Sequence, residues 1–148
     1  MNSGGQGDEV RVKRLRARAR LPTRATAGSS GFDLYACLDE PVLVGQRPVM
    51  VGTGIAVEAA NGLDVQIRPR SGLAKRGILC TFGTIDADYR GELIVTMYSV
   101  AEGIEHEIRD GDRIAQIVIS RLADATFAEV EDLGQSERGT FGHGSTGR

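Results

Sequence analysis

The sequence contains very little cysteine and no long apolar run. Its two cysteines, Cys37 and Cys80, each lie in an apolar segment without the CxxC or His/Cys spacing of a zinc site. We expect both thiols to be buried and unreactive. No run of about 18 apolar residues occurs, and residues 1–9 lack the basic and apolar regions of a signal peptide. These absences predict a cytoplasmic protein that does not cross a membrane.

An excess of positive charge is also missing. The 18 Lys and Arg residues are outnumbered by 20 Asp and Glu, which gives a formal net charge of -2. A general nucleic-acid binder draws its affinity from neutralising backbone phosphates, so this balance argues against nucleic acid as a partner. The arginines of residues 11–20 mostly alternate with apolar residues and indicate the solvated face of a strand. Any bound anion must therefore be held by a local arginine cluster.

Helical periodicity is absent, and the chain is short enough for a single domain. Its 20 glycines lie mainly in turns between short segments of β-type sequence. The segments expected to form strands are 10–19, 31–38, 41–44, 47–59, 63–70, 91–100 and 113–120. This spacing predicts an all-β fold, a jelly-roll-like distorted β-barrel.

The two ends of the chain differ from this pattern. Residues 131–148 lose the β periodicity and are rich in Gly, Ser and Thr, so on their own they are expected to be a disordered arm. Residues 1–9 are expected to be a disordered leader. The predicted β-core therefore covers residues 10–130.

Two segments could take part in anion or metal binding. AGSSGFDLYA, residues 27–36, places Asp33 near the start of a strand, where an aspartate is more often a turn residue. PRSGLAKRG, residues 69–77, offers the planar guanidinium of Arg70 and a small-residue turn through which backbone N–H groups can approach a phosphate. Either segment alone is equally compatible with an ordinary loop.

A third segment carries a more specific combination. GTIDADYRGE, residues 83–92, places the carboxylate of Asp86 beside the aromatic ring of Tyr89 in a predicted hairpin turn. A hairpin requires Gly and Asp but not this pairing, which suits a sugar ring and a water nucleophile. Two further segments are weaker: GDRIAQIVI, in which Gln116 needs a ligand or backbone partner, and RGTFGHGSTGR, which is either a phosphate-binding loop around Arg138 or a flexible linker.

Taken together and in this order, the five segments resemble the five motifs of the homotrimeric dUTPase family, over residues 10–148. The resemblance implies an enzyme that hydrolyses dUTP to dUMP and pyrophosphate with Mg²⁺. Water attacks the α-phosphorus, and the reaction lowers dUTP and supplies dUMP for thymidylate synthesis. Asp86 matches the aspartate that holds and deprotonates this water while accepting a hydrogen bond from the deoxyribose 3′-hydroxyl.

The resemblance also implies the remaining roles. Asp33 would reach the Mg²⁺ ion through water, and Tyr89 would pack under the deoxyribose and reject a 2′-hydroxyl. The uracil edge would be read by the backbone around Gly83, Thr84 and Ile85. The triphosphate would be contacted by Arg70, Ser71, Gly72, Gln116 and Arg138.

The fifth motif departs from the family's usual order, which has a glycine at position 141 and a phenylalanine at position 143. This chain has Phe141 and His143 instead, and the stacking role on uracil passes to His143, with Phe141 as the alternative. The resemblance further implies γ-phosphate contacts and a C3 homotrimer whose active sites combine segments of three chains. The γ-phosphate contacts would be made by Gly144, Ser145 and Thr146.

Two other functions remain possible from the sequence. A dCTP deaminase, or a bifunctional deaminase that also cleaves the triphosphate, shares the fold but would need a second serine after Ser71 and a glutamate in the strand after the hairpin. This chain has Gly72 and LIVTMYS at those places. A non-catalytic protein of the same fold should have lost Asp86 or Arg138, and both are present.

Overall fold

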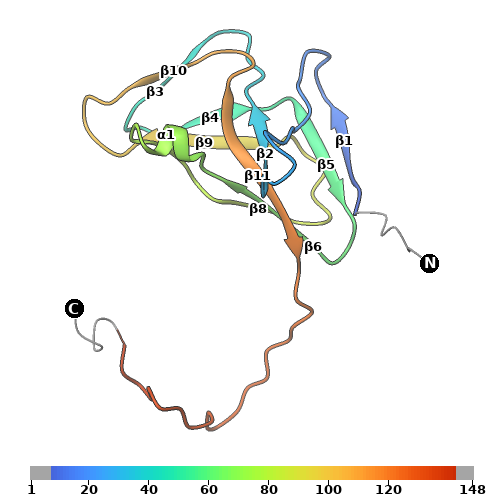
Figure 1. Ribbon diagram of the computed structural model, residues 1–148, viewed down its shortest axis with the longest axis vertical. Coiled ribbons are helices and arrows are strands. Elements are labelled where there is room, and N and C mark those ends of the chain that lie inside the picture. The colour runs from blue at the N-terminus through green and yellow to red at the C-terminus, as the bar shows by residue number, and fades with distance from the viewer. Residues whose placement is uncertain (1–7, 143–148) are drawn as a thin grey trace.

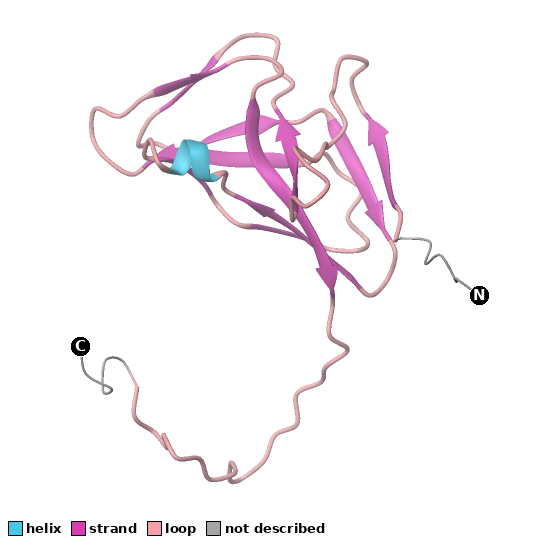
Figure 2. Cartoon of the chain, in the orientation of Figure 1, coloured by secondary structure: helices cyan, strands magenta, loops and turns pink. Residues whose placement is uncertain are grey.

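The computed structural model of the protein describes residues 8–142, and strands dominate them (Figure 1). The strands are β1 Val10–Arg14, β2 Gly31–Tyr35, β3 Val42–Val44, β4 Val49–Gly52, β5 Ile55–Ala59, β6 Leu63–Arg68, β7 Ile78–Cys80, β8 Gly83–Ile85, β9 Ile94–Ser99, β10 His106–Ile108 and β11 Arg113–Arg121. A single-turn helix, α1 Ser71–Ala74, connects β6 to β7 and is the cyan element in Figure 2. The predicted all-β fold is confirmed.

The largest sheet carries most of the expected motif segments. Its strand order is β2-β11-β6-β8, and all three pairings are antiparallel. β11 is central: Gln116 pairs with Asp33 of β2 on one side and with Arg68 of β6 on the other. The first, second and fourth motif segments therefore meet around one end of β11.

A three-stranded sheet, β4-β9-β7, supplies the opposite side of the core, and the pairs β1-β5 and β3-β10 complete the fold. Alternate residues of the two larger sheets are buried against each other, as binary patterning requires. The most deeply buried side chains include Leu34, Val65, Val95, Met97 and Ile114. Cys37 and Cys80 are both buried in this core and form no disulfide, which confirms the expected burial.

The predicted strand over residues 47–59 is interrupted. The backbone turns at Gly54, whose φ of 68° favours glycine, and a Cβ there would lie 2.8 Å from Cys37 Sγ. Thr53 is completely buried at this turn, and its hydroxyl donates a hydrogen bond of 2.6 Å to the Leu93 carbonyl. The segment therefore forms two strands, β4 and β5, in different sheets.

The other differences concern short elements. The strand expected over residues 10–19 ends at Arg14, and residues 78–80, 83–85 and 106–108 form strands outside the predicted set. Arg11 and Lys13 of β1 are exposed while Val12 between them is half-buried, so the expected solvated face is confirmed over this strand. Arg11 lies 2.6 Å from Glu58 of β5, in an ion pair on the surface.

The chain leaves the barrel after β11 (Figure 1). Residues 122–142 form no helix or strand and run away from the body, with Phe127 and Leu133 almost fully exposed. The last strand, β11, thus ends at Arg121, before the predicted end of the β-core at residue 130. The single helix within residues 8–142 has one turn, and none there is long and apolar enough to span a membrane.

Candidate active site

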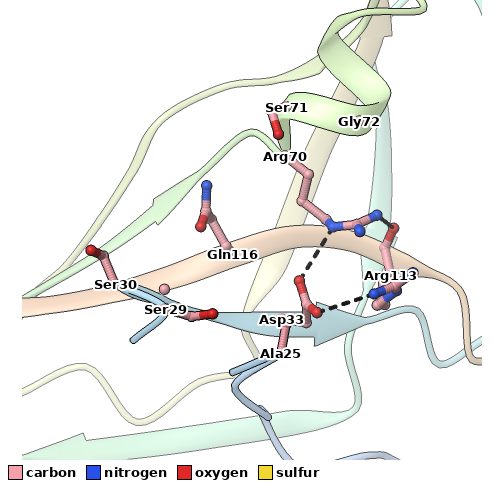
Figure 3. Close-up of a pocket in the computed structure, with 10 residues that line it drawn as sticks. Ala25, Ser29, Ser30, Asp33, Arg70, Ser71, Gly72, Arg113 and Gln116 are labelled. Atoms are coloured by element: carbon pink, nitrogen blue, oxygen red, sulfur yellow. Dashed lines mark hydrogen bonds and ion pairs between the residues drawn. The ribbon is translucent and has the colours of Figure 1, made fainter. Parts of the chain in front are cut away.

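A polar cleft of about 320 Å³ opens where β2, β11 and the start of α1 meet (Figure 3). It brings together three of the expected motif segments, which are far apart in the sequence. The residues that line it are Ala25, Ser29, Ser30, Gly31, Asp33, Arg70, Ser71, Gly72, Arg113 and Gln116. Five of these are expected site residues, and they converge through the pairing of β2 with β11 and the turn after β6.

The charges in the cleft are centred on Asp33. Its carboxylate lies 3.3 Å from Arg70 Nε and 3.6 Å from Arg113 Nη1, and its side chain is only 16% exposed. Arg70 Nη1 also donates a 3.1 Å hydrogen bond to the Arg113 backbone carbonyl. One carboxylate between two guanidinium groups leaves the lining with an excess of positive charge, which favours an anionic ligand.

Gln116 lies beside these charges. Its side-chain amide donates a 2.9 Å hydrogen bond to the Pro69 carbonyl, so the partner it needs in the unliganded chain is a backbone group. This bond connects β11 to the residue before Arg70. Gln116 therefore helps to fix the turn that carries Arg70, and its side-chain oxygen faces Gly31.

The turn after β6 presents small residues at the cleft. Arg70 is extended at the N-cap of α1, Leu73 anchors the helix in the core, and Ser71 and Gly72 are exposed. The first N–H groups of a helix have no partner within it, so they can donate to an external oxygen. A Cβ at Gly72 would meet nothing within 4 Å, which leaves open space above this backbone.

The third segment is not part of this cleft. β8 forms the far edge of the sheet, and Ile85 lies level with Val65 and Ile119, whereas Asp33 lies level with Gln116. Continuing this register, Asp86 comes level with Ser120, so strand spacings place it about 14 Å from Asp33 across the sheet and about 13 Å further along it. The hairpin turn expected within residues 83–92 is also wrong in detail, because β8 before it pairs with β6, while β9 after it pairs with β4 and β7.

Asp86 follows β8 and is exposed. Its backbone carbonyl accepts a 3.0 Å hydrogen bond from the Tyr89 N–H. Within residues 8–142 its carboxylate has no hydrogen bond or ion pair, so the fold of the single chain does not use it. A carboxylate that is free of structural partners is available to a water molecule.

Tyr89 is held in place by its neighbours. Its hydroxyl donates a 2.9 Å hydrogen bond to the Glu92 carbonyl, and its ring lies so close to Gly91 that a Cβ there would be 2.4 Å from the hydroxyl oxygen. Arg90 donates hydrogen bonds to the carbonyls of Ala87 and Tyr89 and lies 3.5 Å from Glu58. These contacts fix the backbone on which Asp86 and Tyr89 sit.

The fifth segment lies away from the cleft within the described part of the chain. Arg138 Nε donates a 2.6 Å hydrogen bond to the Phe141 carbonyl, which closes a tight turn with Gly139 at a φ of 56°. The expected ligand residues His143, Gly144, Ser145 and Thr146 lie outside the described residues.

Sequence reasoning missed Arg113 and the serines at positions 29 and 30 as lining residues. Arg113 belongs to the fourth motif segment. In a regular strand, however, a residue three positions before Gln116 would be expected to face the core. Within residues 8–142 no three His, Cys, Asp or Glu side chains cluster as a metal site. Among residues 8–142, Asp33 is the single carboxylate that lines the cleft, which fits a cation held mainly by its ligand's phosphates and not by a protein cage.

Comparison with known proteins places this geometry in one family. A family model described as dUTPase matches residues 17–147. A deoxyuridine 5′-triphosphate nucleotidohydrolase of Helicobacter hepaticus is 45% identical over 141 residues, covering 93% of this chain and 88% of that protein. The enzyme of the same name from Nautilia profundicola is also 45% identical, covering 95% of this chain and 99% of its own.

A solved structure gives the same result for the fold. A point mutant of the Staphylococcus bacteriophage 80alpha dUTPase, solved with dUpNHpp, superposes with a TM-score of 0.84. It is 26% identical, and the match covers 96% of this chain and all of that one. This chain therefore has the same fold as that dUTPase.

Proposed function

Because this chain belongs to the dUTPase family and is a dUTP diphosphatase, we propose that Asp86 activates the water that attacks the α-phosphorus of dUTP. The observation that carries this proposal is the exposed Asp86 carboxylate, which makes no hydrogen bond or ion pair within residues 8–142. A carboxylate is a weak base, so much of the rate must come from holding water and substrate in line. The same carboxylate accepts a hydrogen bond from the 3′-hydroxyl of the deoxyribose.

The cleft around Arg70 binds the triphosphate. Its lining is positively charged, and the exposed residues Ser71 and Gly72, which follow Arg70 in the chain, also line it. Fixed donors directed at phosphoryl oxygens stabilise the charge that builds up as pyrophosphate leaves. The Gln116 amide exchanges its bond to Pro69 for a phosphate oxygen or keeps it and orients Arg70.

Mg²⁺ is the metal that the cleft fits. When bound, it would neutralise part of the triphosphate charge and help to orient the phosphates. Asp33 would contact the ion only through water, since its carboxylate is already engaged by Arg70 and Arg113.

The loop after β8 recognises the nucleoside. Tyr89 offers a fixed ring to the deoxyribose, and its tight packing against Gly91 leaves it little room to move aside for a 2′-hydroxyl. The backbone of Gly83, Thr84 and Ile85 reads the uracil edge. Because this recognition uses backbone groups, it does not depend on the identity of the side chain at position 80, which is a cysteine in this chain.

The active site is completed by other copies of the chain in a homotrimer. The separation of Asp86 from the phosphate cleft supports this, because one triphosphate substrate must contact both. The exposed segment 122–142 supports a third contribution, since its apolar side chains gain partners only outside this chain's own barrel. The end of this arm, with Arg138 and the residues from His143 to Thr146, would close over the nucleotide.

Pyrophosphate release is the direct test. The full-length protein with Mg²⁺ should turn over dUTP and leave UTP, dTTP and dCTP largely intact, without converting dCTP to a uracil product. Asp86→Asn should bind dUpNHpp normally and lose nearly all turnover. Asp88→Asn is the matched control, because Asp88 is also exposed, lies two residues away and makes no side-chain hydrogen bond or ion pair within residues 8–142. If Asp86→Asn kept as much turnover as an active Asp88→Asn variant, Asp86 would have no part in the mechanism.

A further inference from the structure

The strand β11 contains an irregularity beside the phosphate cleft. Its pairing with β2 matches Ala115 to Leu34 and Arg113 to Tyr35, so Ile114 is an extra residue without a partner on β2. Residues directly opposite each other on antiparallel strands share a face of the sheet. Arg113 therefore lies on the same face as Asp33, Tyr35 and Gln116.

Without this bulge, Arg113 would point into the core. Side chains alternate along a regular strand, so a residue three positions before Gln116 belongs to the opposite face. Here both Ile114 and Ala115 are fully buried, at 1% and 0% exposure, and the alternation resumes one residue out of step. Bulges beside active sites re-aim a side chain in this way.

We propose that the bulge at Ile114 presents Arg113 as a second phosphate-binding guanidinium, which contacts the β- or γ-phosphate of the substrate directly. This inference rests on the proposed phosphate role of the cleft. Figure 3 shows Arg70 and Arg113 both directed at Asp33 from different elements. Arg70 and Asp33 are largely enclosed, whereas the Arg113 side chain is 52% exposed at the mouth.

The contacts of the two arginines differ in a way that supports separate roles. Arg70 donates to the Arg113 carbonyl and lies closer to Asp33. The Arg113 guanidinium donates no hydrogen bond within residues 8–142, and its ion pair with Asp33, at 3.6 Å, is beyond hydrogen-bond length. A guanidinium held this loosely can exchange a shared carboxylate for phosphate oxygens, to which arginine binds through two parallel N–H donors.

The competing explanation is that Arg113 only holds Asp33 in place. In EDTA, where no Mg²⁺ links Asp33 to the phosphates, a structural partner of Asp33 would affect every ligand of the cleft to the same extent. If Arg113 instead binds phosphate, its loss would weaken binding most for the ligands that carry the most phosphates. Binding of dUpNHpp, dUMP and inorganic tripolyphosphate to the full-length protein separates these two possibilities.

Arg113→Gln should weaken binding of dUpNHpp and tripolyphosphate by about tenfold or more, the usual effect of losing a hydrogen bond to a charged group, and change dUMP binding by less than about twofold. Arg113→Lys should recover part of the loss, since lysine keeps the charge without the planar fork. Arg109→Gln is the matched control. Arg109 is 73% exposed and pairs with Glu107, and its substitution removes the same charge from the same region of the chain. Its binding constants should equal those of the wild type.

Equal weakening of dUMP and dUpNHpp in Arg113→Gln, or no weakening of either, would overturn the proposal. Thermal unfolding of each variant separates misfolding from lost contacts, and Arg113→Lys still reports if Arg113→Gln fails to fold. Tripolyphosphate binding needs no turnover. A wild type that binds it through Arg113 but leaves dUTP intact would refute the proposed mechanism and leave this inference standing.

Discussion

The side chain of Gln116 occupies the space directly over Gly31: a Cβ at residue 31 would lie 2.3 Å from Gln116 Oε1. Gly31→Ala should therefore push the Gln116 amide out of the cleft and break its bond to the Pro69 carbonyl. Because Gln116 orients the turn of Arg70 or binds phosphate itself, kcat/KM for dUTP should fall by about tenfold, measured by pyrophosphate release.

Gly28 provides a control in the same segment. A Cβ there meets nothing within 4 Å, so Gly28→Ala should leave kcat/KM unchanged. Gln116→Ala in the Gly31→Ala background should add little further loss, because both changes remove the same amide. Additive losses in the double variant would show that the glycine acts through another contact.

The barrel was predictable from the sequence because its longer strands carry clear alternation, as in LDVQIR, where every second residue is buried. The three-residue strands β8 and β10 were not, since Gly83 and the polar pair of His106 and Glu107 carry no periodic apolar signal. Gly52 and Gly54 were the visible signs that residues 47–59 turn a corner, but glycines inside a strand pattern do not by themselves specify a break.

The candidate site was predictable at positions where a polar or charged residue type by itself indicates a binding role. Arg70, Gln116 and Asp33 fall in short polar interruptions, and strand pairing then brings them together. Arg113 was missed because one extra residue in β11 reverses its face, and a bulge depends on pairing across strands that the sequence does not display. The distance from Asp86 to the cleft likewise follows from strand order.

The enzyme should lose part of its selectivity for dUTP over UTP when Gly91 is changed. A Cβ at residue 91 would lie 2.4 Å from the Tyr89 hydroxyl oxygen, so Gly91→Ala must displace the ring from its place against Glu92. The ratio of kcat/KM for dUTP to that for UTP should fall by about tenfold. Tyr89→Phe is the control, because it removes the hydroxyl and keeps the ring, and its ratio should stay near that of the wild type. A preserved ratio in Gly91→Ala would exclude the ring as the barrier to a 2′-hydroxyl.

Cys80 gives the stability a specific dependence on pH. Burial raises the pKa of the Cys80 thiol from its ordinary 9.0 to about 11. The unfolded chain therefore releases this proton at a lower pH than the folded chain, and the thiol's contribution to stability is complete below pH 9 and lost as the pH approaches 11. The free energy of unfolding of wild type minus that of Cys80→Ala, measured in urea at fixed protein concentration, should shrink across this range. A constant difference would contradict the shift.

Removal of the arm should separate activity from stability. Residues 138–142 bond only among themselves and to Ser136 within the described chain, so a protein that ends at Glu137 should keep its thermal midpoint and its oligomeric state. Its kcat should fall by about a hundredfold, the usual loss when donors to a reacting phosphate are removed. Arg138→Gln in the full chain shows how much of this loss belongs to Arg138. Full activity in the shortened protein would mean that the arm is not part of the site.

Mixed oligomers of two inactive variants test whether Asp86 and Arg70 of one site come from different chains. Asp86→Asn and Arg70→Gln should each be inactive alone, since one lacks the carboxylate and the other the guanidinium paired with Asp33. The two variants are refolded together in equal amounts to form mixed trimers. If a site takes Asp86 from one chain and Arg70 from its neighbour, it is intact when its Asp86 comes from an Arg70→Gln chain and its Arg70 comes from an Asp86→Asn chain. Random assembly gives this combination in roughly a quarter of the sites, so the mixture should regain roughly a quarter of wild-type turnover. If both residues of a site belonged to the same chain, no mixture could restore activity, and an inactive mixture with normal sedimentation as a trimer would rule out the shared site.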